Sequence, residues 1–212
     1  MLVHPWDAAD DAEWRSWLAQ QSVGTLITRG DPWPVVVPTH FVFDGDATVL
    51  FHLARPNPAL AAMAADPEVV FSVSGDWAYI PSSWNAEPDS DLRRGIPTSY
   101  YAAVILRCRA ELLAGEDLVE LLRTQLASFE PGSGVVDPAE HGRELPGIRG
   151  VRLSVLAAQA KFKYGGNATA GRRATIAANL ADRAQGGDLA ARDHLQRRPA
   201  FGRKESGKTA RG

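Results

Sequence analysis

The sequence predicts a mainly β fold with peripheral helices (α+β), arranged as an antiparallel barrel. Two observations support this prediction. Six or seven segments rich in β-branched and aromatic residues follow one another, mostly joined by short turns. Helical periodicity is confined to the N-terminus, one crossover and the C-terminal region. A Rossmann fold would instead alternate strands with helices along the chain.

The predicted strands form two groups, with five short strands before residue 81 and two long strands after residue 97. Asp44-Gly45-Asp46 is typical of a hairpin turn, and Gly75-Asp76 predicts another turn. Pro38 lacks an N–H and therefore predicts a bulge or an edge position within its strand. The predicted strands are residues 23–29, 35–43, 48–54, 68–74, 77–80, 98–113 and 148–163.

Five helices are predicted from apolar residues at i, i+3 and i+4 spacing. Asn57 can cap the second of them, with Pro58 at its first helical position. Two polar loops, residues 81–97 and 131–145, separate the longer elements, and loops of this length are often functional. The predicted helices are residues 11–20, a short helix from residue 58, 116–129, 172–183 and 188–197.

The composition is that of a globular protein. Of 212 residues, 45% are hydrophobic and 23% are charged, which excludes disorder of the whole chain. No apolar run approaches the ~18 residues of a membrane span, and the N-terminus lacks the apolar core of a secretory signal. The single cysteine, Cys108, excludes an internal disulfide framework and a cysteine-based zinc site. We expect a cytoplasmic protein without membrane contact.

Charge is distributed unevenly along the chain. Residues 171–212 carry ten Lys/Arg and four Asp/Glu, whereas residues 1–170 carry the remaining 13 and 21. A basic C-terminal segment can contact nucleic acid through phosphates, or it can be a solvated terminal helix. We predict one domain over residues 1–198, including the C-terminal helices, followed by a disordered basic tail at 199–212.

One motif in the tail is interpreted as a chance match. Residues 202–209 read GRKESGKT, which fits the phosphate-loop pattern. That loop needs a preceding strand and a following helix whose N-terminus holds the phosphate. Only three residues follow Thr209, so no such helix can form there.

Three strand ends combine cationic, hydroxyl and aromatic side chains. The segment HLARPNP (52–58) places Arg55 beside a capped helix start, which favours anion binding. The segment PTSYY (97–101) offers Thr98 and Tyr100, and KFKYGGN (161–167) places two lysines on one strand face. Together they predict a site for a flat molecule with a phosphate. Taken singly, each could be a surface ion pair or a solvated strand edge.

The order of the segments HLARPNP, AYIPSSW, IPTSYYAAV and AKFKYGGN, followed by a helix with Arg172, Arg173 and Ile176, resembles the PaiB-like family. These are FMN-binding split-barrel proteins related to pyridoxamine-phosphate-oxidase-type flavoproteins. The resemblance covers about residues 1–198, and HLAR-x-NP is its most specific part.

The resemblance implies a six-stranded antiparallel split barrel, a homodimer and an FMN site near the subunit interface. It also implies kinship with negative transcriptional regulators. Matched residue by residue, the family pattern and its aromatic neighbours suggest ten flavin-site candidates. They are Thr25, His40, His52, Arg55, Asn57, Trp84, Thr98, Tyr100, Lys161 and Lys163.

The sequence departs from the family pattern at the end of the last strand. There the family usually reads G-K-W-K-L-S-Q-N, whereas this chain has Ala160, Phe162 and Tyr164-Gly165-Gly166. Three hypotheses follow: an FMN-binding homodimer, a flavin-dependent oxidoreductase that uses NAD(P)H or a deazaflavin, and a regulatory or interaction module that has lost FMN. No residue stands out as a catalytic acid or base, and the histidines lack metal-ligand spacing.

Overall fold

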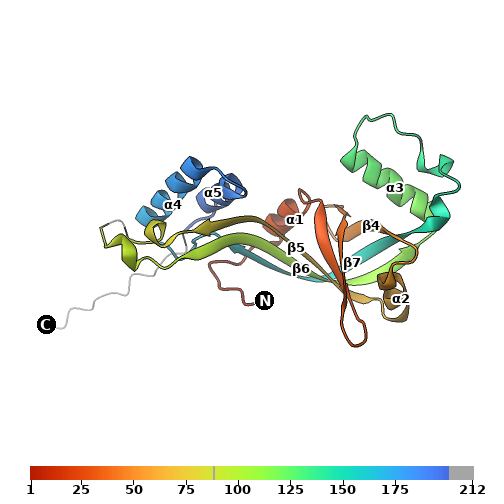
Figure 1. Ribbon diagram of the computed structural model, residues 1–212, viewed down its shortest axis with the longest axis horizontal. Helices are drawn as coiled ribbons and strands as arrows, with labels where there is room; N and C mark the ends of the chain where they lie inside the picture. Colours follow the sequence, from red (N-terminus) through yellow and green to blue (C-terminus); the bar gives the residue numbers. More distant parts are fainter. Residues whose placement is uncertain (88, 201–212) are drawn as a thin grey trace. The chain divides into compact units, whose positions relative to one another are not determined.

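The computed structural model describes residues 1–87 and 89–200 (Figure 1). The predicted tail beyond residue 200 and the phosphate-loop-like segment 202–209 lie outside the described residues.

The predicted mainly β antiparallel fold is confirmed. The strands form one sheet in the order β2-β1-β5-β6-β7-β4-β3, with β2 and β3 at its edges. β1 pairs antiparallel with β2 and β5, and β4 pairs antiparallel with β3 and β7. The sheet has seven strands where the resemblance implied six. They are β1 (Val23–Thr28), β2 (Val35–His40), β3 (Val42–Phe43), β4 (Thr48–Ala54), β5 (Glu68–Ile80), β6 (Thr98–Leu113) and β7 (Ile148–Lys163).

The predicted strand 35–43 is divided in two, which produces the additional strand. Phe41 interrupts it: its side chain is buried and its backbone N–H donates to the Ser22 carbonyl at 2.9 Å. β2 pairs with β1, whereas β3 pairs with β4. Pro38 lies on edge strand β2 opposite Thr25, so the predicted edge position is confirmed.

The predicted turn at Gly75-Asp76 is wrong, because β5 runs without a break through both residues. Asp76 has a φ of 52°, a left-handed conformation that Asp tolerates better than most residues. Its carboxylate lies 2.8 Å from Nε2 of His194, and its carbonyl accepts from the Tyr164 hydroxyl at 3.2 Å. These contacts hold the unusual residue within the strand.

All five predicted helices are present. Asp10 caps the first, Asn57 caps the second and Thr169 caps the fourth, each accepting a backbone N–H through its side-chain oxygen. The loops 81–97 and 131–145 contain short 3₁₀ turns. The helices are α1 (Asp11–Leu18), α2 (Pro58–Ala65), α3 (Glu116–Phe129), α4 (Ala170–Arg183) and α5 (Asp188–Arg197).

The chain forms two compact units. Among the described residues, unit 1 consists of residues 1–9, 75–102 and 161–200, and unit 2 consists of residues 10–74 and 103–160. The prediction of one domain over residues 1–198 stays a prediction.

Unit 2 has an aromatic core. Phe71 contacts Phe41 edge to face at 5.1 Å between ring centroids, and it lies nearly parallel to Phe51 at 5.8 Å. Burying each such ring stabilises the fold by about 1.5–3 kcal/mol. Cys108 is also buried in this unit, and burial raises the pKa of its thiol to about 12.

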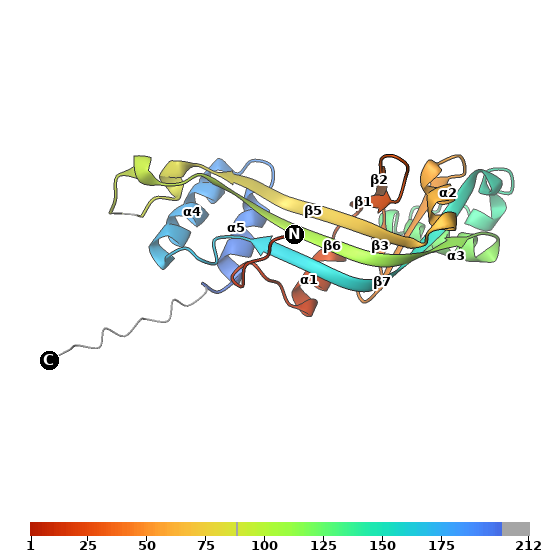
Figure 2. The same ribbon diagram turned by 90° about the horizontal axis from the view of Figure 1, so that it is seen from below.

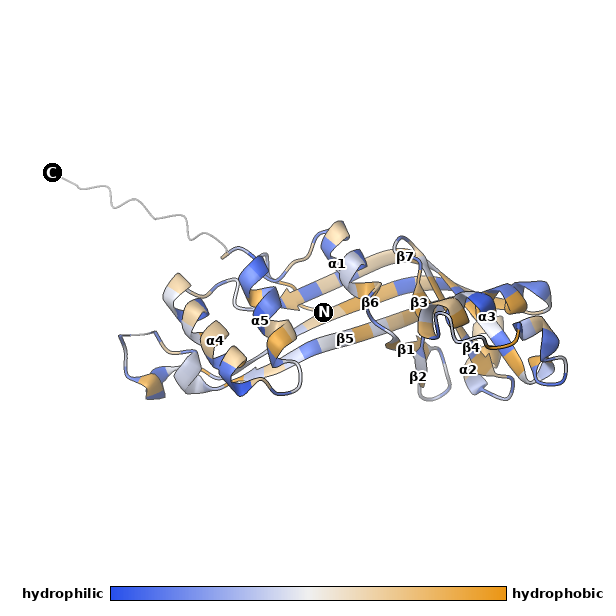
Figure 3. Cartoon of the chain, turned by 90° about the horizontal axis from the view of Figure 1, so that it is seen from above, coloured by the Kyte–Doolittle hydropathy of each residue, from blue (hydrophilic) through white to orange (hydrophobic). Residues whose placement is uncertain are grey.

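In unit 1, α4 and α5 lie side by side (Figures 1 and 2). Both helices carry hydrophilic and hydrophobic residues (Figure 3), and Ile176, Leu180 and Leu195 are buried. Arg183 on α4 contacts Asp188 at the start of α5 through two nitrogens, at 2.6 and 2.7 Å.

Candidate functional site

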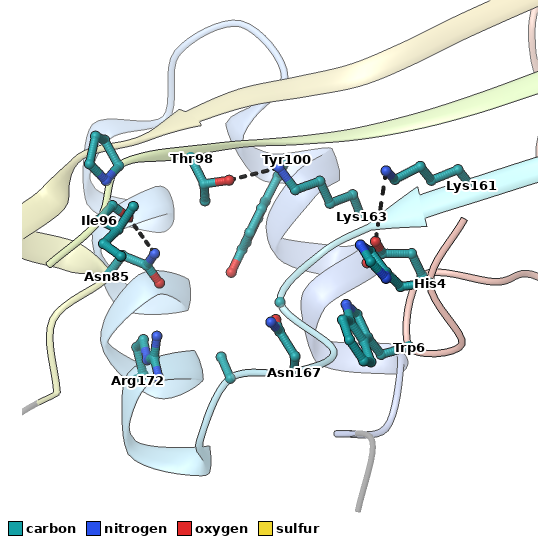
Figure 4. Close-up of a pocket in the computed structure, with 14 residues that line it drawn as sticks. His4, Trp6, Asn85, Ile96, Thr98, Tyr100, Lys161, Lys163, Asn167 and Arg172 are labelled. Carbon is teal, nitrogen blue, oxygen red and sulfur yellow. Dashed lines mark hydrogen bonds and ion pairs between the residues drawn. The ribbon is translucent and has the colours of Figure 1, made fainter. Parts of the chain in front are cut away.

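Unit 1 contains a pocket of about 350 Å³ (Figure 4). Its walls come from the N-terminal segment, the loop before β6, the ends of β6 and β7, and the first turn of α4. The lining residues are His4, Trp6, Asp7, Asn85, Ile96, Pro97, Thr98, Tyr100, Lys161, Lys163, Gly165, Asn167, Ala168 and Arg172.

Three cations line this pocket. The Lys161 ammonium donates to the Leu2 carbonyl at 3.0 Å and lies 3.9 Å from the Asp7 carboxylate. The Lys163 ammonium donates to the Thr98 hydroxyl at 2.8 Å, and Arg172 donates to a Glu87 carboxylate outside the pocket lining at 2.6 Å. Positive charge therefore exceeds negative charge on the lining.

The one carboxylate on the lining, Asp7, is buried. Burial raises the pKa of Asp7, and the positive charges of Lys161, His4, Lys163 and Arg198 oppose that shift.

Two buried donors of the pocket have no hydrogen-bond partner among the described residues. They are the Tyr100 hydroxyl and Nε of Arg172. Tyr100 is only 2% exposed, and burial raises its pKa to about 12, so the hydroxyl keeps its proton at neutral pH. Buried donors are normally satisfied, so unpaired ones suit a ligand with acceptor atoms.

The N-terminal segment is fixed against the end of β7. The Phe162 N–H donates to the Asp7 carbonyl at 2.8 Å, and Ala8 bridges to Lys161 in antiparallel fashion. The ring of His4 is stacked on Trp6, with 4.6 Å between centroids. Sequence reasoning missed this wall, because a nine-residue segment has no periodicity that reveals a partner 150 residues away.

Trp84 belongs to unit 1 but does not line the pocket. The Arg183 guanidinium lies 4.6 Å from its ring centroid, a cation–π contact that covers one face of the indole.

Unit 2 brings His40 on β2 close to His52 on β4, with ring centroids 5.1 Å apart. Nδ1 of His52 lies 2.7 Å from Oε1 of Gln125 on α3. Gln125 is 4% exposed, and its amide nitrogen has no partner among the described residues. Burial lowers the pKa of His40, and His52 lowers it further, which favours a neutral imidazole.

Arg55 and Asn57 lie at the start of α2, as predicted. Oδ1 of Asn57 accepts the Ala59 N–H at 3.0 Å, so its amide serves as the helix cap. Arg55 is exposed, and within residues 1–87 and 89–200 its guanidinium has one long hydrogen bond, 3.5 Å to the Pro146 carbonyl. Thr25 is half-buried on β1, opposite Ser72 of β5.

The ten predicted residues therefore divide between the units. Four of them line the unit 1 pocket: Thr98, Tyr100, Lys161 and Lys163. Trp84 lies elsewhere in unit 1, and the other five lie in unit 2. Over residues 1–87 and 89–200, no group of three or more His, Cys, Asp or Glu side chains could hold a metal ion. Within the same ranges, no helix is both long and apolar enough to span a membrane.

Comparison with known proteins gives the family. Residues 1–157 match the family model described as "Putative FMN-binding domain". The chain is 29% identical over 161 residues to "Protease synthase and sporulation protein PAI 2" of Bacillus subtilis (strain 168), covering 72% of this chain and 75% of that protein.

Two solved structures share the fold. The flavocytochrome Anf3 from Azotobacter vinelandii has a TM-score of 0.58 and 23% identity, with 76% of this chain and 71% of that chain covered. The FAD and heme binding protein from Mycobacterium smegmatis has a TM-score of 0.59 and 18% identity, with 72% and 71% covered. The family match and the sporulation relative together confirm the resemblance seen in the sequence. The chain therefore belongs to this FMN-binding family and is a PaiB-like member of it.

Proposed function

We propose that the protein is a cytoplasmic homodimeric flavoprotein in which residues of unit 2 hold FMN. The observation that carries this proposal is the exposed Arg55 beside the capped N-terminus of α2, within the segment that matches the family. A guanidinium and helix N-terminal amides both favour a phosphate.

The other candidate side chains of unit 2 also suit FMN, because they offer uncharged hydrogen-bonding groups. The buried amide nitrogen of Gln125 is an unpaired donor beside His52. FMN is rich in carbonyl, hydroxyl and phosphate acceptors. His40 and His52 can each present one donor and one acceptor while uncharged, so they can bind the cofactor without adding charge. Thr25 supplies a further hydroxyl on β1.

FMN, when bound, supplies hydride- and electron-transfer chemistry that no side chain offers. The protein's part in this proposal is to neutralise the phosphate with Arg55 and to orient the cofactor with neutral donors. Trp84, Thr98, Tyr100, Lys161 and Lys163 stay predictions as flavin contacts.

The test is an FMN titration of the purified protein and of Arg55→Ala, followed by visible absorption and gel filtration. We expect the wild type to retain FMN and Arg55→Ala to raise the dissociation constant about tenfold or more, because a charge-assisted contact contributes about 1.5–3 kcal/mol. Arg107→Ala, another exposed arginine of unit 2, is the matched control. If Arg55→Ala and Arg107→Ala bind FMN with equal affinity, Arg55 does not contact the FMN phosphate.

The other two hypotheses have direct tests on the same material. NAD(P)H consumption or deazaflavin oxidation by the FMN-loaded protein would favour an oxidoreductase. Salt-dependent binding of duplex DNA by the full chain would favour a regulatory role. Sedimentation velocity measures the proposed dimer.

A further inference from the structure

We propose that the pocket of unit 1 is a second ligand site, separate from FMN, that takes a small organic anion such as a phosphate monoester. Its position in the sequence is the first reason. The three cations of the pocket are Lys161, Lys163 and Arg172, and all three follow residue 157, where the match to the FMN-binding family ends. These three residues therefore lie beyond the stretch that the family model matches, although Lys161 and Lys163 also belong to the family-like segment AKFKYGGN.

The charge balance of the pocket selects an anion. The lining carries three cations and one carboxylate, Asp7. Lys161 is only 9% exposed, and its distance of 3.9 Å from Asp7 is too long for a hydrogen bond. Lys163 has a neutral hydroxyl, that of Thr98, as its hydrogen-bond partner. Arg172 is paired with Glu87 at 2.6 Å, so Lys163 is the lining cation that has no carboxylate partner among the described residues. An anionic ligand matches this charge in a partly enclosed site.

The unpaired hydrogen-bond donors of the pocket favour a ligand group with several acceptor oxygens. Tyr100 comes from β6 and points into the pocket, on the side where Asn167 and Arg172 lie (Figure 4). Its hydroxyl and the Arg172 Nε are buried and unpaired among the described residues. A phosphate or sulfate group accepts several such hydrogen bonds at once.

The apolar and aromatic residues of the pocket favour a ligand that also carries an organic group. The stacked His4–Trp6 pair and Ile96 lie on opposite sides of the pocket in Figure 4. A volume of about 350 Å³ lies at the lower end of the range for small-molecule sites. The pocket therefore fits a small metabolite with one phosphate or sulfate group and a compact body.

Calorimetric titration of the FMN-saturated full chain tests the proposal. The probes are ribose 5-phosphate, inorganic phosphate, sulfate and uncharged ribose. We expect ribose 5-phosphate to bind more tightly than either inorganic dianion, and ribose to show no binding. Absence of binding by all three anions at millimolar concentration, or equal binding of ribose, overturns the proposal.

Two variants locate the binding. Arg172→Gln and Lys163→Met should each weaken ribose 5-phosphate about tenfold or more, because each removes a charge-assisted contact. The matched control is Arg192→Gln on α5, whose guanidinium pairs with the neighbouring Asp193 and does not line the pocket. Circular dichroism checks that every variant is folded.

FMN affinity separates this site from the flavin site. We expect Arg172→Gln to bind FMN as the wild type does, and ribose 5-phosphate to leave FMN in place. Displacement of FMN by ribose 5-phosphate, or a loss of FMN with Lys163→Met as large as that with Arg55→Ala, would assign the pocket to the flavin and overturn the proposal. If the protein binds no FMN, the same titration on the flavin-free chain still tests the pocket.

Discussion

At the scale of single residues, two adjacent glycines shape the unit 1 pocket. Gly165 has a φ of 65°, and a Cβ there would collide with the Tyr100 hydroxyl. A Cβ on Gly166 would collide with the Trp6 carbonyl. In the family motif these positions usually carry polar side chains. In this chain their absence makes room for Tyr100 and for the N-terminal segment.

Gly165→Ala should therefore damage the pocket more than it damages the fold. The added methyl group must displace the Tyr100 hydroxyl. The alanine backbone must also adopt a left-handed conformation, which costs about 1–3 kcal/mol. We expect weaker ribose 5-phosphate binding and a lower urea midpoint. Gly142→Ala is the control, because a Cβ at residue 142 meets no atom within 4 Å. Unchanged binding in Gly165→Ala would show that the hydroxyl does not contact the ligand.

Asp7 should make anion binding depend on pH. As the pH falls through its raised pKa, the carboxylate takes up a proton and the pocket becomes more positive. We expect sulfate, which stays a dianion, to bind more tightly as titrations move from about pH 8 to about pH 4. Asp7→Asn should bind more tightly at neutral pH and lose most of this dependence.

Lys161, His4, Lys163 and Arg198 all act on Asp7. A second variant, His4→Gln added to Asp7→Asn, separates the contribution of the neighbouring imidazole. A sulfate affinity that stays constant with pH in the wild type would contradict this role for Asp7.

At the scale of elements, an ion pair between Arg183 and Asp188 connects α4 to α5. The Asp188 carboxylate is buried and accepts two bonds from Arg183 and one from the Gln185 N–H. Arg183 also donates to the Tyr79 carbonyl of β5 at 2.8 Å. The pair therefore ties both helices to a strand of the same unit.

Asp188→Asn should lower the free energy of unfolding by about 1–3 kcal/mol, because Arg183 keeps a partly buried charge without its counter-ion. The Arg183 hydrogen bonds hold the pKa of Asp188 below its ordinary value. The stabilisation is therefore present above the unfolded pKa of about 3.9 and is lost as pH falls through the lower folded value. Urea unfolding at several pH values measures it. Asp193→Asn, in an exposed ion pair, should change the free energy of unfolding by less than about 0.5 kcal/mol. If it lowers stability as much as Asp188→Asn does, the Arg183–Asp188 pair has no special stabilising role.

Elements whose signals are local could be predicted from the sequence. The bounds of α3, α5, β6 and β7 are those predicted, because continuous apolar patterns and end residues define them. The turn at Gly75-Asp76 is wrong because a contact with His194, more than 100 residues later, holds Asp76 in the strand. The strand-end motifs predicted Arg55, Thr98, Tyr100, Lys161 and Lys163 as one site, but only the last four line the pocket, and Arg55 belongs to unit 2. His4, Trp6 and Asp7 join the pocket through pairing that no local pattern encodes.

At the scale of the whole molecule, FMN should stabilise the folded protein by linkage. A ligand that binds only the folded state adds about 2.7 kcal/mol at a concentration 100 times its dissociation constant. We expect the urea midpoint of the wild type to rise accordingly with FMN. At the same FMN concentration, Arg55→Ala should show a rise smaller by about 1.4 kcal/mol for each tenfold loss of affinity. Riboflavin, which lacks the phosphate, is the matched control ligand, and equal stabilisation by both would contradict a phosphate site at Arg55.

Among the described residues, unit 1 is assembled from three stretches that are far apart in the chain, residues 1–9, 75–102 and 161–200. During synthesis the first stretch leaves the ribosome long before the last one exists. At a translation rate of about 5–20 residues per second, several seconds or more pass between the synthesis of His4 and Trp6 and that of the end of β7. The two stretches of unit 2, residues 10–74 and 103–160, are translated during this interval and are available to fold. Residues 1–9 are thus translated before the other parts of unit 1, but they reach their native neighbours only once the end of β7 has been made.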